Sequence, residues 1–167
     1  WQYGWRIITL GGLLFTAMLI ALTFIDADTQ YLPDQITLPL IWLGLLFNLN
    51  GAFVPLSSAV LGAVFGYMSL WLLCYVYKLL TGKVGMGGGD FKLLAALGAW
   101  LGVGVLPVIV FIAALIGVLA AVLLRVAKGQ QFAFGPSLAV AGWLVFIANE
   151  KVLAALGWWL RASGFSA

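Results

Sequence analysis

Residues 57–80 read SSAVLGAVFGYMSLWLLCYVYKLL, and the only charged side chain among them is that of Lys78. An α-helix rises about 1.5 Å per residue, so about 20 apolar residues cross the roughly 30 Å hydrocarbon core of a bilayer. This stretch is long enough and apolar enough to predict a transmembrane helix.

Five further apolar segments lie around this helix, separated by short polar or glycine-rich loops. They span residues 5–25, 36–49, 90–101, 106–124 and 134–148. Of the 167 residues 65% are hydrophobic and 8% are charged, with a mean hydropathy of +1.16, whereas soluble domains carry about 25% charged residues. The sequence predicts an all-α fold, a polytopic membrane helix bundle with about six transmembrane helices in a single domain over residues 1–167. The tail from Glu150 to Ala167 contains Trp158 and Trp159, which predicts a short interfacial segment.

The inventory of reactive side chains excludes several kinds of site. The chain contains no histidine, and its one cysteine, Cys74, lies inside an apolar run. These residues therefore supply no intramolecular disulfide, no CxxC zinc site and no His-based catalytic triad. The net charge is +3, but the eight basic residues are scattered singly, which argues against nucleic acid as a partner.

Two aspartates stand where an apolar run meets a polar or glycine-marked loop. Asp26 follows the run that ends at Ile25, and Asp90 follows Gly85-Met-Gly-Gly-Gly89. An Asp at the centre of a membrane helix costs roughly 2.5–3.5 kcal/mol, so an acid near membrane depth is a candidate functional residue. An even number of predicted crossings separates Asp26 from Asp90, which returns both to the same membrane face. We therefore expect them to share one site.

Two carboxyl groups in one site hold a single proton over a wide pH range, because they cannot both ionise easily. An aspartic protease uses such a pair: the ionised member deprotonates a water and the protonated member polarises the scissile carbonyl. Taken alone, Asp90 has a simpler interpretation as the N-cap of the helix it opens. Asp28 and Asp34 are typical turn or cap residues beside Pro33. Lys92 either stabilises an ionised carboxylate or makes a structural or interfacial contact.

The distribution of basic residues predicts an orientation. The loops on the side of the two aspartates carry Lys78, Lys83, Arg125 and Lys128, whereas the other side carries chiefly Arg6, Lys151 and Arg161. Basic residues are enriched in cytoplasmic loops. The two aspartates are therefore expected at the cytoplasmic face.

Two glycine pairs predict close helix packing. Gly62 and Gly66 form one GxxxG spacing, and Gly98 and Gly102 form another. Such pairs let helix backbones approach closely in membranes. We expect them to be packing sites rather than functional ones.

The aspartate motifs resemble those of the type IV prepilin peptidase family. The resemblance, from about residue 22 to 142, is carried by Asp26 with Leu32-Pro33-Asp34 and Thr37-Leu-Pro39, by Gly85-Met-Gly-Gly-Gly-Asp90-Phe-Lys-Leu-Leu94, and by Phe134-Gly-Pro136. It implies an intramembrane aspartic endopeptidase with Asp26 and Asp90 as catalytic residues. The implied enzyme lies in a bacterial inner membrane and cuts basic leaders from prepilins and type II secretion pseudopilins after a glycine, at the cytoplasmic face.

The residues around the two aspartates also suggest where substrate binds. Gly85, Gly87, Gly88 and Gly89 form a segment that we expect to clamp an extended peptide, although Gly88 stands where the family often has a bulkier residue such as Tyr. The acidic segment with Asp26, Asp28 and Asp34 is expected to attract a leader rich in Lys or Arg.

Longer members of the family carry an upstream helix and a cytosolic domain with paired CxxC motifs, and many also methylate the new N-terminus with S-adenosylmethionine. These residues contain no such motif, so no cofactor is expected in this chain, and zinc or S-adenosylmethionine would belong to an upstream region.

The main alternative is a small ion- or proton-coupled transporter whose aspartates bind a cation. Transporters usually place such acids near the midplane, often within an internal repeat. No repeat is evident in this sequence, and both acids map to one face, so the peptidase is the favoured interpretation.

Overall fold

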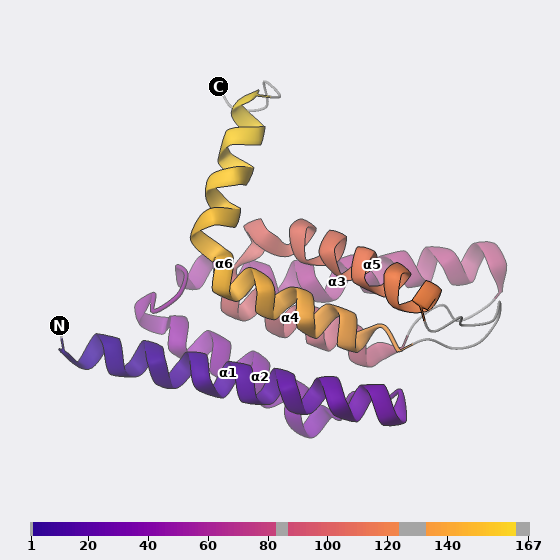
Figure 1. The fold of residues 1–167 in the computed structure, drawn as a ribbon, viewed down its shortest axis with the longest axis horizontal. Coiled ribbons are helices and arrows are strands. Elements are labelled where there is room, and N and C mark those ends of the chain that lie inside the picture. Colours follow the sequence, from indigo (N-terminus) through magenta and orange to yellow (C-terminus); the bar gives the residue numbers. More distant parts are fainter. Residues whose placement is uncertain (1, 83–86, 124–132, 163–167) are drawn as a thin grey trace.

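The structure of the chain, a computed structural model, describes residues 2–82, 87–123 and 133–162. These ranges contain six α-helices and no strand, which confirms the predicted all-α class. The helices are α1 (Gln2–Thr29), α2 (Asp34–Phe47), α3 (Leu56–Thr81), α4 (Gly88–Leu101), α5 (Leu106–Leu123) and α6 (Gly135–Ala162), with short 3-10 turns at Asn48–Asn50 and Val103–Val105. In Figure 1 the helices run roughly side by side, except that the C-terminal part of α6 turns away from the bundle.

Three segments are long and apolar enough to span a membrane, by length and composition: Ile7–Thr29, Leu56–Thr81 and Val103–Leu123. Large apolar side chains on their outer faces are exposed, among them Leu13, Leu80 and Leu123, as expected for a surface that faces lipid. Helix α4 differs, since 11 of its 14 residues are buried. It packs against α2, α3 and α6, and it is the central helix of a membrane bundle.

Glycines allow α3 and α4 to pack backbone to backbone. A Cβ added at Gly62 would overlap the carbonyl oxygen of Gly98, and one added at Gly98 would overlap that of Gly62. At Gly66 an added Cβ would lie 2.7 Å from the carbonyl oxygen of Leu94. The packing role predicted for the GxxxG spacings is therefore confirmed, and this contact fixes α4 in the bundle.

A polar and aromatic cluster holds the C-terminal end of α4. The fully buried Asn48 side chain donates to the carbonyl of Ala99 (2.9 Å) and accepts the backbone N–H groups of Phe53 (2.9 Å) and Val54 (3.0 Å). The buried Trp100 indole donates to the carbonyl of Leu40 (2.8 Å). These bonds anchor the turn after α2 to α4.

We expect Asn48→Ala to destabilise the protein by at least about 2 kcal/mol. The change leaves one carbonyl and two N–H groups without their partner, and an unsatisfied buried polar group costs roughly 1–3 kcal/mol. Unfolding of purified protein in detergent measures the difference. Asn50→Ala, at an exposed position two residues away, is the matched control and should change stability by less than about 0.5 kcal/mol. Equal stability of the two variants would contradict the anchoring role.

Several helix boundaries differ from the prediction, three of them in ways that concern the two aspartates or the tail. Helix α1 continues past Ile25 to Thr29, whose hydroxyl donates to the carbonyl of Ile25 (2.7 Å), and it ends where Gln30 takes a left-handed conformation (φ 53°). Helix α4 begins at Gly88, two residues before the expected start at Asp90. Helix α6 does not stop near residue 148 but continues to Ala162. Its departure from the bundle in Figure 1 fits the interfacial tail expected there.

Candidate active site

Three helix ends meet at one end of the bundle and carry the candidate site. They are the C-terminal end of α1 and the N-terminal ends of α4 and α6, which lie together on the right in Figure 1. The last turn of α1 contains Asp26 and the first turn of α4 contains Asp90. Their side chains are only 4% and 8% exposed. The sequence prediction that both acids lie at one end of the bundle therefore agrees with the structure.

The Asp26 carboxyl group lies against the start of α6. The backbone amide of Gly135 interacts with it, and a Cβ added at Gly135 would overlap its Oδ2 atom. Oδ2 is buried and has no hydrogen-bond partner among the described residues. A buried carboxylate oxygen without a partner is costly, so this atom is available to a water or a substrate group.

Asp90 is not the N-cap of α4. The N-cap position is occupied by Gly87 and carries no side-chain capping bond, and Asp90 lies inside the first turn. The simple capping interpretation of Asp90 is therefore wrong. Asp90 instead lies at the same end of the bundle as Asp26, from which it is 64 positions apart in sequence.

Leu32 lies in the same site, between the starts of α4 and α6. A Cβ added at Gly89, the neighbour of Asp90, would lie 2.7 Å from the Cβ of Leu32. A Cβ added at Gly135, beside Asp26, would lie 3.1 Å from Cδ1 of Leu32. The Leu32 side chain is 4% exposed and therefore fills the space between the two glycine-marked helix starts.

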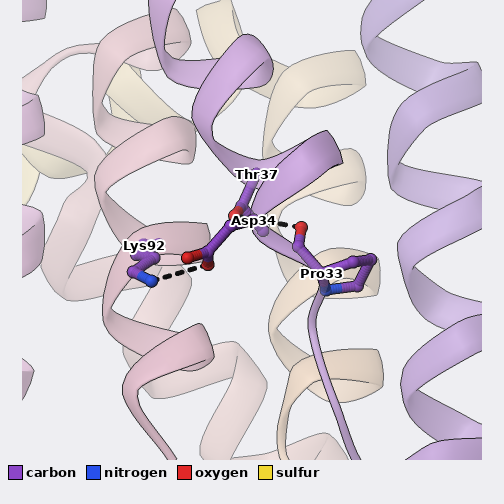
Figure 2. A network of polar contacts seen from close by, with 4 residues as sticks. All are labelled: Pro33, Asp34, Thr37 and Lys92. Carbon is purple, nitrogen blue, oxygen red and sulfur yellow. Dashed lines mark hydrogen bonds and ion pairs between the residues drawn. The ribbon is translucent and has the colours of Figure 1, made fainter.

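An ion pair joins α2 to α4 beside the site. Figure 2 shows Asp34, the first residue of α2, extending toward Lys92, with Nζ and Oδ1 2.6 Å apart. The hydroxyl of Thr37 donates to the carbonyl of Pro33 (3.2 Å) at the same helix start. Both side chains of the ion pair are partly exposed, so the pair adds at most about 1 kcal/mol. The structural contact expected for Lys92 is present.

The remaining predicted residues are dispersed. Asp28 is exposed on the last turn of α1. Gly85 lies outside the described residues. Gly87 and Gly88 have open space where a Cβ would stand, whereas Gly89 faces Leu32. Leu32 and Gly135 belong to the motifs around the aspartates, but no role was predicted for either, because their importance lies in which residues they touch.

Comparison with known proteins assigns the chain to a family. The model of the type IV leader peptidase family matches residues 13–122, which include both aspartates. The chain is 72% identical over 160 residues to a prepilin leader peptidase/N-methyltransferase of Neisseria gonorrhoeae, covering 96% of this chain and 56% of that protein. A protein of the same name from Aeromonas salmonicida (strain A449) is 52% identical over 153 residues, covering 89% of this chain and 52% of the relative.

The chain thus spans about half the length of the curated relatives it matches. No solved structure matches it. Since the family model covers about two thirds of the 167 residues, this chain belongs to the type IV leader peptidase family.

Proposed function

We propose that these residues form the membrane-embedded part of an aspartic endopeptidase that removes basic leaders from type IV prepilins and type II secretion pseudopilins after a glycine. The observation that carries this proposal is that two buried carboxyl groups lie at one end of the bundle, Asp26 on the last turn of α1 and Asp90 on the first turn of α4. The family assignment and the names of the relatives support it.

The proposed chemistry uses the two carboxyl groups and one water. The ionised carboxylate removes a proton from the water, whose oxygen attacks the scissile carbonyl, while the protonated carboxyl donates to the carbonyl oxygen. A proton then passes to the leaving amine as the peptide bond breaks. Neither a metal nor an organic cofactor enters these steps, so we propose that hydrolysis needs none.

We further propose that the site faces the cytoplasm in a bacterial inner membrane. Lys78 lies in the last turn of α3 and Lys92 is the fifth residue of α4, so both lie near the helix ends on the side of Asp90. Basic residues favour the cytoplasmic side. The second activity in the relatives' names, N-methylation, is not assigned to these residues.

The test is cleavage of a purified prepilin by the whole protein in detergent, followed by mass spectrometry of both products. We expect a cut after the glycine at the end of the leader. Ion flux across vesicles containing the protein, without prepilin cleavage, would instead support the transporter.

The acidic segment with Asp26, Asp28 and Asp34 was expected to attract a basic leader, and the structure narrows this hypothesis to fewer residues. Since Asp34 is paired with Lys92, the hypothesis now depends chiefly on the exposed Asp28. We expect Asp28→Asn to raise the KM for a basic-leader substrate by about two- to fivefold at low salt, because one exposed charge pair contributes roughly 0.2–1 kcal/mol. The effect should vanish at high salt, where the Debye length is about 3 Å at 1 M. A KM ratio that does not change with salt would contradict the role.

A further inference from the structure

Leu32 touches two backbone segments that both carry glycine at the point of contact. One is Gly89 in the first turn of α4, and the other is Gly135 at the start of α6. Neither position has φ in the left-handed region, so backbone conformation does not require glycine there. What requires it is space. A Cβ at Gly89 would lie 2.7 Å from the Cβ of Leu32, and a Cβ at Gly135 would overlap Oδ2 of Asp26 and lie 3.1 Å from Cδ1 of Leu32.

The same side chain borders the space in which the reaction would occur. Gly89 immediately precedes Asp90, and the position of a Gly135 Cβ borders both Leu32 and Oδ2 of Asp26. A peptide bond that reaches both carboxyl groups must therefore pass close to Leu32. The backbone of the substrate would then lie beside Leu32, as the backbones at Gly89 and Gly135 already do.

We propose that Leu32 is a specificity-determining residue, which restricts the substrate position before the scissile bond to glycine by excluding a Cβ. This inference rests on the proposed peptidase function and identifies the source of its selectivity. It assigns Leu32 a steric role rather than a chemical one, since the side chain has no group that transfers a proton.

The location of Leu32 in the chain allows it to exclude a Cβ and still admit the backbone of a peptide. It lies on the short linker between α1, which ends at Thr29, and α2, which begins at Asp34. Leu32 is part of the buried core, but the linker that carries it has no regular secondary structure, whereas α4 and α6 are hydrogen-bonded helices. A shift of the linker therefore opens the site at lower cost than a shift of either helix.

The test compares two prepilins that differ only in Gly or Ala before the scissile bond. For the wild-type protein in detergent we expect the Gly substrate to be strongly preferred in kcat/KM. For Leu32→Ala we expect this preference to fall by about tenfold or more, since one methylene in a tight site is worth roughly 10- to 200-fold. Because the preference is a ratio measured on one sample, it does not depend on the fraction of folded enzyme.

Leu40→Ala is the matched control. Leu40 is fully buried on α2, so its truncation removes the same atoms from the core and should leave the Gly/Ala preference unchanged. Leu32→Met keeps the volume and should retain the preference, whereas Leu32→Val should relax it in part. If Leu32→Ala or Leu32→Val prefers the Gly substrate over the Ala substrate as strongly as the wild-type protein does, the proposal is overturned. Failure of the wild-type protein to cleave either substrate would instead reject the peptidase function.

Discussion

Asp26→Asn and Asp90→Asn should each reduce prepilin cleavage by roughly 10²–10⁴-fold, the usual contribution of a positioned general acid or base. An amide neither accepts a proton from water at neutral pH nor donates an acidic proton to a carbonyl. Both side chains are buried at the same end of the bundle. The double variant should lose little more than either single variant, because residues that act as a unit are not additive.

Two comparisons make this result specific. Asp28→Asn makes the same chemical change two residues along α1, on an exposed side chain, and we expect only the small, salt-dependent effect on KM described above. Unfolding midpoints in detergent should show that each inactive variant is folded. A folded Asp26→Asn or Asp90→Asn protein with near-normal kcat would remove that residue from the catalytic pair, and with it the proposed mechanism.

The helical bundle could be predicted because membrane helices leave a simple trace in sequence. Apolar runs predicted all six helices, although only three of the described segments are long enough to span a membrane. The GxxxG spacings predicted the close α3–α4 contact. The ends of the helices were harder to predict. The polar residues after Ile25 suggested a loop. Asp26 is buried in the structure, however, and α1 continues for one more turn to Thr29.

The site was predictable in part, for the same reason. An acid is rare in such a composition, so Asp26 and Asp90 are conspicuous, and the parity of the crossings brings them to one face. Leu32 and Gly135 are ordinary residues in an apolar, glycine-rich chain. Their importance becomes visible only in the fold, where the start of α6 lies beside the end of α1. A contact between residues 32 and 135 cannot be predicted from the local sequence around either one.

Gly135→Ala should reduce kcat by about 100-fold in a protein that still folds. The added methyl group would overlap Oδ2 of Asp26 and stand 3.1 Å from Cδ1 of Leu32. The carboxyl group must therefore turn or α6 must retreat, and a misplacement of about 1 Å in a catalytic group costs on the order of 10²-fold. Overpacking of this size costs roughly 1–3 kcal/mol of stability, which unfolding in detergent measures separately from activity.

Gly117→Ala provides the control for Gly135→Ala, because it adds the same methyl group where α5 faces the first turn of α6. There the new atom would lie 3.5 Å from Oγ of Ser137 and 3.6 Å from the Phe134 ring, which are ordinary contacts, so kcat should stay within about twofold of wild type. Leu32→Ala should not rescue Gly135→Ala, since removing the leucine leaves the overlap with Asp26 in place. If Gly135→Ala cleaves at the wild-type rate, the start of α6 does not position Asp26. If Leu32→Ala restores its activity, the harmful contact is the one with Leu32 rather than the one with the carboxyl group.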